Sequence, residues 1–547
     1  MTTPHTYITT TIPYVNARPH IGFALELVQA DVLARFRRQR GDDVRFQSGT
    51  DDNSLKNVLA AQAAGADVQE FVDRNAEAFL ALGPALSLTV DDIIRTSRDG
   101  RHRPGVERVW RACAAAGDLY RKRYEGLYCT GCEQFYTPAE LRDGCCPEHG
   151  TEPQPVAEDN WFFRLSRYAA PLREAINAGR LLIEPAGRRN EVLALIDGGL
   201  ADFSVSRPAT RAGGWGIPVP GDPGQVVYVW FDALCNYVTA LGYGQGQSEA
   251  YRRWWAGPGN RVHLLGKGVL RFHAVCWPAM LLASGQQLPT AIFVHDYLTA
   301  GGRKISKSGA GASAPGPGTP EPAALAAEYG ADAVRWWLLR EVPRVGDADF
   351  TVERLVARAD DELANGLGNL VNRVVAMIGR YRAGRIPVAA AVPPGGEDLD
   401  AAIRHAGDRV GAALAEFDFR QATAAVWGIA DEANRFVNRV RPWDLAKADP
   451  AGRLDAVLYL LARACAAVGR ELAPFLPDAA ARVTAQCTPG DDGRLPDPRP
   501  VFRRLSAPAG LRVEQPQQDQ QDQGADDRPD DPDRVEAPPN RDETARP

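Results

Sequence analysis

The sequence predicts an α/β protein whose main domain is a Rossmann-type, doubly wound parallel sheet. Three observations predict this architecture. Residues 6–118 alternate β-like runs with helical patterns, and the alternation resumes after residue 225. Residues 119–224 carry clustered cysteines, glycines and prolines without that alternation, as expected of an inserted domain. From residue 351 the pattern changes to long amphipathic helices, which is typical of an α-helical bundle.

The individual elements follow from the spacing of apolar residues. Residues 7–15 predict a buried strand, and residues 20–41 predict a helix with a mostly apolar stripe. Further strands are expected at 44–49, 226–230, 262–266 and 291–295, and further helices at 53–64, 352–381, 399–416, 419–440 and 451–476. The expected segments are the first half of the sheet domain (1–118), the insertion (119–224), the second half (225–308), a linking region (309–350), the helical bundle (351–505) and a disordered tail (506–547).

The composition is that of a soluble globular protein. The 547 residues are 45% hydrophobic and 24% charged, with no charged-then-apolar leader and no apolar run of about 18 residues, so we expect a cytoplasmic location. The net charge of −6 argues against a protein that coats nucleic acid, although a local basic patch could still bind RNA. Residues 309–322 predict a flexible loop, and the Gln-, Asp- and Pro-rich residues 514–547 predict disorder.

Four of the nine cysteines lie between Cys129 and Cys146, and this cluster predicts a metal site. Cys129-x2-Cys132 is followed after 13 residues by Cys146-x2-His149, which gives two chelating pairs at finger-like spacing. Soft thiolates with one imidazole select Zn²⁺, and four protein ligands leave no open position, so the ion would be structural. Cys145 could replace Cys146 as the third ligand, and a chance cluster of cysteines is the alternative.

Two segments far apart in the chain have the residue types of a nucleotide phosphate site. Pro19-His20-Ile21-Gly22-Phe23 follows a predicted strand and opens a predicted helix, where a Gly beside a His lets the helix N-terminus approach an anion. Lys304-Ile305-Ser306-Lys307-Ser308 stands on a Gly-rich loop after the strand at 291–295, and its two lysines could neutralise a triphosphate. A solvated basic loop is the alternative for this second segment.

The order and spacing of these segments resemble those of the class I aminoacyl-tRNA synthetases, and further motifs resemble the methionyl-tRNA synthetases in particular. These motifs are Thr11-Ile12-Pro13-Tyr14-Val15-Asn16, Ser48-Gly49-Thr50-Asp51, Tyr228-Val229-Trp230-Phe231-Asp232-Ala233, Gly266-Lys267, Phe272-His273 and Trp277-Pro278. The resemblance extends to about residue 505 and includes the cysteine cluster. Three positions depart from the family's usual pattern: Phe23 replaces a second His, Leu234 a Pro and Gly268 an Asp.

The resemblance implies an ATP-dependent ligase that joins methionine to tRNA(Met) through a methionyl-adenylate and releases AMP and pyrophosphate. The implied catalytic residues are His20, Gly22, Lys304 and Lys307, and the implied ATP-binding residues are His20, Gly22, Phe23, Gly266, Lys267, His295, Lys304, Ser306 and Lys307. Methionine would contact Ile12, Tyr14, Asp51, Trp230, Ala233, Leu234, Tyr237, Val269, His273 and Trp277, with Asp51 on its α-ammonium.

The helical bundle would then read the CAU anticodon. Asn369 and Arg373 stand at i and i+4 on one helix face, and Pro442-Trp443 is expected to end the helix that begins near Phe419. Unpaired bases are usually held by stacking and by edge hydrogen bonds, which suits Trp443 with Asn369 and Arg373. The alternative is a packing tryptophan beside a polar helix face. Residues 309–350 would carry the lysine loop and contact the tRNA stem.

The implied cofactors are structural Zn²⁺ and the Mg²⁺ that accompanies ATP, and the implied partners are methionine, ATP and tRNA(Met). We expect a monomer with no membrane or DNA partner. One alternative is a catalytically weakened paralogue that binds tRNA or an amino acid, which Phe23 and the loop after Ser308 would favour. Another is a class I synthetase for a different amino acid, although the insertion is short for an editing domain and the aromatic residues suit methionine.

Overall fold

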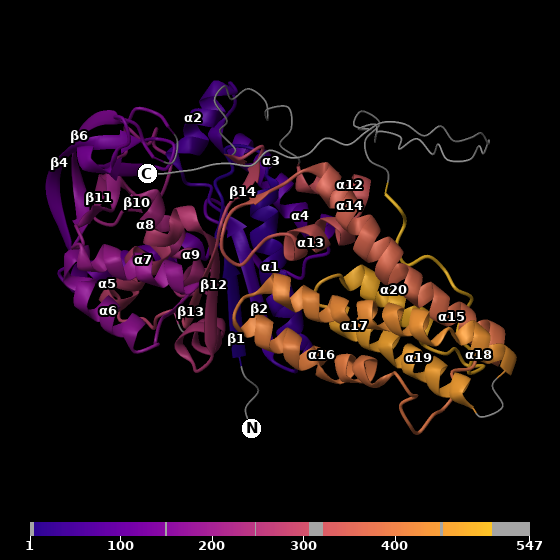
Figure 1. Cartoon of the computed structure of the whole chain (residues 1–547). Helices are drawn as coiled ribbons and strands as arrows, with labels where there is room; N and C mark the ends of the chain where they lie inside the picture. The colour runs from indigo at the N-terminus through magenta and orange to yellow at the C-terminus, as the bar shows by residue number, and fades with distance from the viewer. Residues whose placement is uncertain (1–4, 148–149, 247, 306–320, 449–451, 506–547) are drawn as a thin grey trace, which may run out of the picture. The chain divides into compact units, whose positions relative to one another are not determined.

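The centre of the protein is a six-stranded sheet in the order β3-β2-β1-β12-β13-β7, in which all neighbouring strands are parallel. The structure is a computed structural model that describes residues 5–147, 150–246, 248–305, 321–448 and 452–505. Its central strands are β1 (His5–Thr10), β2 (Asp43–Thr50), β3 (Asp92–Arg95), β7 (Leu182–Glu184), β12 (Asn260–Gly266) and β13 (Ala291–His295). The predicted doubly wound sheet is confirmed, because β1 and β12 join the two halves of the sequence side by side (Figure 1).

The described residues of the first half of the sheet domain form five helices, of which α1 is the most buried. They are α1 (Ile21–Gln39), α2 (Leu55–Ala63), α3 (Val68–Leu80), α4 (Leu82–Ala85) and α5 (His102–Ala115). Helix α1 is buried around most of its circumference over its first 14 residues, because β1, β2 and β12 cover one side and α13 (Ala331–Arg340) covers another. A helix buried in this way holds its N-terminus in a fixed place at the edge of the sheet.

The segment between the two halves forms its own antiparallel sheets. One has the order β5-β4-β6-β8, and the other has the order β10-β11-β9. Their strands are β4 (Leu119–Cys129), β5 (Gln134–Tyr136), β6 (Gln154–Phe163), β8 (Phe203–Ser204), β9 (Ser206–Pro208), β10 (Pro218–Val219) and β11 (Asp222–Val227), with helices α6 (Ala169–Asn177) and α7 (Ala186–Asp197). The same segment also supplies β7, which pairs with β13 at the edge of the central sheet.

The second half of the sheet domain continues after β11 with short helices. They are α8 (Val229–Leu234), α9 (Asn236–Thr239), α10 (Glu249–Tyr251), α11 (Trp277–Ala283) and α12 (Pro322–Tyr329), with helical turns at Arg252–Ala256, Lys267–Val269 and Phe272–Cys276. A small sheet of β14 (Leu298–Ala300), β15 (Arg303–Lys304) and β16 (Ala348–Asp349) follows β13.

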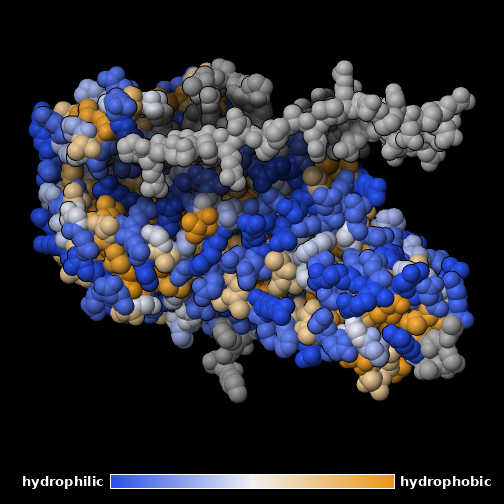
Figure 2. Space-filling view, in the orientation of Figure 1, coloured by the Kyte–Doolittle hydropathy of each residue, from blue (hydrophilic) through white to orange (hydrophobic). Residues whose placement is uncertain are grey.

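The C-terminal part of the described chain is helical, as predicted (Figure 1). It comprises α14 (Val352–Arg358), a π-helical stretch (Ala359–Gly368), α15 (Asn369–Arg382), α16 (Glu397–Ala415), α17 (Phe419–Val440), α18 (Pro442–Ala448), α19 (Arg453–Leu472) and α20 (Pro477–Cys487). No helix in the described ranges is long and apolar enough to span a bilayer. Figure 2 shows hydrophilic residues over most of the visible face, with hydrophobic patches scattered among them.

Three sequence-based assignments are wrong in detail. Residues 226–230 are not a strand of the central sheet, because β11 pairs antiparallel with β9. Strand β11 also ends at Val227, and α8 begins at Val229. The strand predicted at 7–15 ends at Thr10, close before Pro13, which has no N–H to donate to a ladder. Arg441 adopts a left-handed conformation that ends α17, so Pro442 and Trp443 begin α18 instead of ending the preceding helix.

Arg335 on α13 is a fully buried cation that connects the sheet domain to the helical bundle. Its guanidinium lies 2.8 Å from the Asp31 carboxylate of α1 and donates to the carbonyls of Leu86, at 3.0 Å, and Phe475, at 2.7 Å. Burial alone would raise the pKa of Asp31, but Arg335 and the neighbouring Arg35 lower it below its ordinary value. Both charges are therefore kept ionised inside the protein by each other.

We predict that Arg335→Met destabilises the fold by about 3–5 kcal/mol, because it leaves the buried Asp31 carboxylate without its cation. The measurement is the midpoint of urea unfolding at neutral pH. Arg435→Met is the matched control, since Arg435 is largely exposed and pairs with carboxylates on its own helix, and it should leave the midpoint nearly unchanged. Equal shifts for the two variants would contradict a special role for the buried pair.

Candidate active site

A cavity of about 320 Å³ lies at the carboxyl edge of the sheet, where ligands of doubly wound folds commonly bind. It is lined by residues from both halves of the sequence. The sequence-predicted residues that line it are Ile12, Tyr14, His20, Gly22, Phe23, Asp51, Trp230, Ala233, Leu234, Tyr237, Gly266, Val269, His273 and His295. The structure therefore brings together most of the residues expected to contact methionine and several of those expected to contact ATP.

One end of the cavity is aromatic. The Trp230 ring lies parallel to that of Phe272 with 3.9 Å between their centroids, and the Tyr14 ring meets Trp230 edge-on at 6.3 Å. Aromatic pairs in these two arrangements are favourable and fix the rings relative to each other. This end of the cavity suits an apolar group. Phe272 is a lining residue that the site prediction omitted, although it stands directly before His273 in the sequence.

His273 and Tyr237 close the same end with a hydrogen-bonded pair. The Tyr237 hydroxyl lies 2.8 Å from His273 Nε2, and His273 Nδ1 lies 3.0 Å from the Val269 carbonyl. Because a carbonyl can only accept, Nδ1 carries the proton and Nε2 accepts from the phenol. Burial lowers the pKa of His273 to about 4, so the ring is neutral at physiological pH.

Trp277 is the one predicted methionine contact that is not among the residues lining this cavity. Its side chain is fully buried, its ring centroid lies 5.9 Å from that of Tyr237, and its Nε1 donates to His263 Nε2 at 3.3 Å. Trp277 therefore packs behind Tyr237 and supports the pocket wall.

Asp51 brings a buried carboxylate to the cavity. Its Oδ1 accepts no hydrogen bond from any described residue, and its backbone bridges to that of Tyr14. Burial raises the pKa of Asp51 well above the ordinary value, and the neighbouring carboxylates of Asp232, Glu133 and Asp52 raise it further. A bound cation would relieve both effects, so this position favours an ammonium group.

Asp232 belongs to a buried network that the sequence prediction missed. His102 Nε2 lies 2.5 Å from one oxygen of Asp232, and the Asn53 amide donates to the other at 2.8 Å. The second nitrogen of His102 lies 2.8 Å from the Thr239 hydroxyl. Asp232 stands within a motif recognised in the sequence, but His102 is 130 residues away, so no local pattern connects them.

The N-terminus of α1 faces the polar end of the cavity. His20 is the extended residue before the helix, and a Cβ atom on Gly22 would lie 3.1 Å from the His20 ring. Gly22 therefore lets the imidazole fold closely over the first helical turn. Phe23 lines the cavity but is only 8% exposed, and its ring packs edge-on against Phe79 at 5.4 Å. Phe23 thus forms part of the core.

Glu26 and His295 join the two halves of the chain at this polar end. One Glu26 oxygen accepts from the backbone N–H and the hydroxyl of Thr11, both at 2.6 Å, and the other lies 3.1 Å from His295 Nε2. The predicted nucleotide contact Lys267 is engaged elsewhere, because its ammonium lies 2.5 Å from an Asp347 carboxylate oxygen. The sequence-based site prediction missed Glu26. Its one signal in the sequence is that an acidic residue stands inside the apolar stripe of the predicted helix.

The predicted lysine loop begins beside the cavity. Lys304 lies in β15, and Ile305 after it lines the cavity. Ser306, Lys307 and the glycine-rich residues up to 320 lie outside the described residues, as does the predicted tail from residue 506.

The predicted anticodon residues lie in the helical bundle. Asn369 is exposed at the start of α15, Arg373 follows one turn later, and Trp443 is partly buried at the start of α18. Among the described residues, no hydrogen bond joins Trp443 to Asn369 or Arg373. Asn369 and Arg373, four residues apart in α15, lie on one face of that helix.

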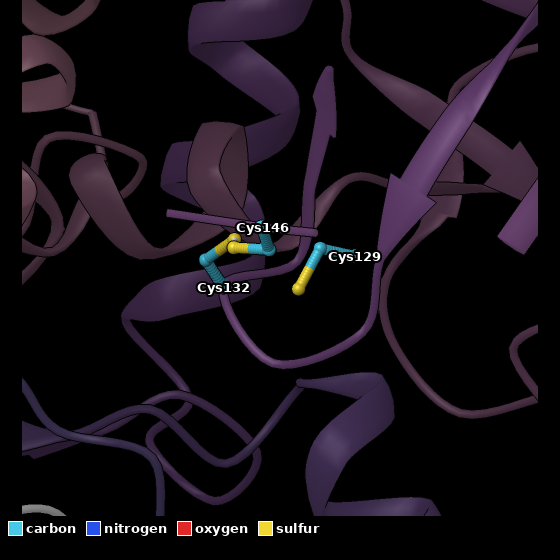
Figure 3. A group of neighbouring side chains, drawn as sticks. All are labelled: Cys129, Cys132 and Cys146. Carbon is cyan, nitrogen blue, oxygen red and sulfur yellow. Dashed lines mark hydrogen bonds between the residues drawn. The ribbon is translucent and has the colours of Figure 1, made fainter. Parts of the chain in front are cut away.

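The cysteine cluster forms a compact set of sulfur atoms (Figure 3). The Sγ atoms of Cys129, Cys132 and Cys146 all lie within 4.8 Å of one another, and those of Cys132 and Cys146 are 3.7 Å apart. Three soft donors at this spacing fit a metal ion such as Zn²⁺. Cys146 rather than Cys145 supplies the third sulfur, and the predicted fourth ligand, His149, lies outside the described residues.

The split parallel sheet, the cavity at its carboxyl edge and the helical C-terminal region together have the fold of a class I tRNA synthetase. The family described as tRNA synthetases class I (M) matches residues 6–154 and 136–375. The chain belongs to this methionyl-tRNA synthetase family.

Individual relatives agree with this assignment. The methionine–tRNA ligase of Caldanaerobacter subterraneus subsp. tengcongensis is 39% identical over 473 residues, covering 86% of this chain and 72% of the relative. That of Brucella suis biovar 1 is 38% identical over 521 residues, covering 91% and 97%. The structure of Mycobacterium tuberculosis methionyl-tRNA synthetase in complex with methionyl-adenylate superposes with a TM-score of 0.85 at 35% identity, covering 92% of this chain and all of that one.

We predict that the purified protein holds one metal ion per chain at the cysteine cluster, measured by elemental mass spectrometry. Cys132→Ser should lower the metal content severalfold, because a hydroxyl is a poor ligand for a soft ion. Cys276→Ser is the matched control, since Cys276 is buried far along the chain in the sheet domain, and it should leave the content unchanged. Unchanged metal content in Cys132→Ser would contradict the site.

Proposed function

We propose that this chain ligates methionine to tRNA(Met) with ATP, through a methionyl-adenylate, releasing AMP and pyrophosphate. The observation that carries the proposal is a single cavity with two chemically different ends. Its aromatic end, beside the buried carboxylate of Asp51, suits an amino acid with an apolar side chain, and its other end meets the N-terminus of α1. The relatives' names, and the methionyl-adenylate bound to the M. tuberculosis enzyme, support the same reaction.

The methionine side chain would lie against Trp230, Tyr14 and His273. Burial of the thioether supplies most of its binding free energy, and sulfur–aromatic contacts add a smaller share. The neutral His273 places no charge against the side chain, while Asp51 pairs with the α-ammonium. Ile12, Ala233, Leu234, Tyr237 and Val269 would complete the pocket wall, with Trp277 behind it.

The adenylation step needs positioning and charge stabilisation, because the methionine carboxylate itself attacks the α-phosphorus in line. His20 and the N–H groups at the start of α1 would bind phosphate oxygens, and Gly22 leaves room for the close approach. Gly266, His295 and Phe23 would border the nucleotide, and Lys304, Ser306 and Lys307 would close over its phosphates, with Mg²⁺ screening their charge. Lys267, also expected to bind ATP, pairs with the carboxylates of Asp347 and Asp296 and would act by holding them beside the nucleotide.

The remaining assignments extend this proposal beyond the cavity. Cys129, Cys132, Cys146 and His149 would hold a structural Zn²⁺, and Asn369, Arg373 and Trp443 would bind the CAU anticodon. We further propose the domain boundaries stated from the sequence, a cytoplasmic monomer, and no membrane or DNA partner. Sedimentation at micromolar concentration tests the monomer, and a dimer mass would refute it.

Amino acid-dependent exchange of pyrophosphate into ATP tests the function directly. We predict exchange with methionine and none above background with the other 19 amino acids. Exchange with a different amino acid would refute the specificity, and no exchange with any would favour a catalytically weakened paralogue. Charging of a tRNA(Met) transcript, compared with one whose CAU anticodon is altered, then tests the tRNA partner.

We predict that Asp51→Asn raises KM for methionine by about 10- to 100-fold, the usual loss for a charge-assisted hydrogen bond, and leaves KM for ATP little changed. Only ionised Asp51 pairs with the ammonium. Because its pKa is raised, the ionised fraction falls at a pH where an exposed aspartate is still charged. KM for methionine should therefore rise on acidification in the parent protein and be flatter in Asp51→Asn. The exposed control Asp431→Asn should keep the parent profile.

A further inference from the structure

The turns that follow β12 and β13 face each other at the polar end of the cavity, since these strands are parallel neighbours and Gly266 pairs with His295. Gly268 and Tyr297, one on each turn, both line the cavity. A Cβ atom on Gly268 would lie 2.1 Å from the Tyr297 hydroxyl oxygen and 3.3 Å from the ring carbon that bears it. The phenol therefore occupies the space that any side chain at residue 268 would need.

Tyr297 is held in this position from two directions. Its backbone N–H donates to Asp347 Oδ1 at 2.9 Å, and the Lys267 ammonium lies 4.5 Å from its ring centroid. Lys267 is itself fixed by Asp347, at 2.5 Å, and by Asp296, at 3.5 Å. These contacts place the phenol before any ligand arrives, so a hydrogen bond to the ligand costs little reordering of the side chain.

The charges around Tyr297 favour a neutral partner over an anionic one. The Lys267 ammonium on this wall pairs with the carboxylates of Asp296 and Asp347. Asp296 also pairs with Arg188, whose second partner is Glu191. Within the part of the chain that the structure describes, both cations of this wall are paired with carboxylates, whereas the N-terminus of α1 favours an anion. A hydroxyl group of the ligand is the partner that fits the phenol.

We propose that Tyr297 is a specificity-determining residue whose phenol hydrogen-bonds a ribose hydroxyl of the bound nucleotide, and that Gly268 is required because it leaves room for that phenol. The inference rests on the proposed function, and it adds the residue that distinguishes a ribonucleotide from a deoxyribonucleotide. Lys267 contributes by fixing the Tyr297 ring.

The first test compares ATP, 2′-deoxyATP and 3′-deoxyATP in methionine-dependent pyrophosphate exchange. Tyr297→Phe should raise KM for ATP about five- to tenfold, the effect of one neutral hydrogen bond, with KM for methionine unchanged. It should also reduce, by a similar factor, the discrimination against at least one deoxy analogue. Tyr120→Phe is the matched control, because the Tyr120 phenol lies on β4 and donates to the Asp202 carboxylate at 2.9 Å, and it should change neither KM.

The second test is a double-mutant cycle with Gly268→Ala. The added methyl group must displace the phenol, so Gly268→Ala alone should raise KM for ATP as Tyr297→Phe does. In the Tyr297→Phe background the alanine should add at most twofold, because the nearest Tyr297 atoms that remain are ring carbons at 3.3 and 3.8 Å. Additive effects would overturn the role of Gly268, and an equal rise of KM for all three nucleotides would assign the phenol to a phosphate and overturn the ribose contact.

The two proposals can fail separately. If the parent protein gives no exchange with any amino acid, calorimetric binding of ATP and 2′- and 3′-deoxyATP to the parent, Tyr297→Phe and Tyr120→Phe proteins still tests the ribose contact. Discrimination that Tyr297→Phe leaves unchanged overturns the inference in either assay. This comparison does not use Gly268→Ala, so the ribose contact can be tested even if that variant fails to fold.

Discussion

The buried pair of Arg335 and Asp31 is the interaction on which the relation between the sheet domain and the helical bundle depends. Asp31 lies midway along α1, and Arg335 also donates to carbonyls before β3 and after α19. Such a pair is stable only when both charges remain matched, because either one alone would be a buried unpaired ion. The same helix presents His20 and Gly22 at its N-terminus, so the anchor at its middle also fixes the polar end of the cavity.

The cavity combines two environments that no single segment could supply. Its aromatic end comes mainly from α8, α9 and the helical turn at Phe272–Cys276, while its polar end comes from α1 and the carboxyl ends of β12 and β13. Parallel strands place all of these at one edge of the sheet. The acidic cluster around Asp51 and the partial positive charge at the N-terminus of α1 then impose opposite charge preferences within one cavity, as an amino acid and a nucleotide would require.

The cysteine cluster is part of this architecture and not a separate appendage. Gly131, Cys132 and Gln134 line the cavity, and Trp230 Nε1 donates to the Cys132 carbonyl at 3.4 Å. A metal ion that fixes the Cys129–Cys132 turn would therefore also fix one wall of the aromatic end. The cysteine cluster and the adjacent pocket thus share the same backbone.

The sequence by itself determined the parallel sheet, the helical C-terminal region, the family and nearly half of the residues that line the cavity, because these depend on local periodicity and on motifs a few residues long. It predicted β13 and α17 with the bounds that the structure has. Only the tertiary structure decided the pairing of β11, the choice of Cys146 over Cys145, the place of Trp277 behind Tyr237, and the contacts of His102 with Asp232 and of Gly268 with Tyr297. Most of these depend on the packing of segments 29 to 130 residues apart, which local composition does not encode.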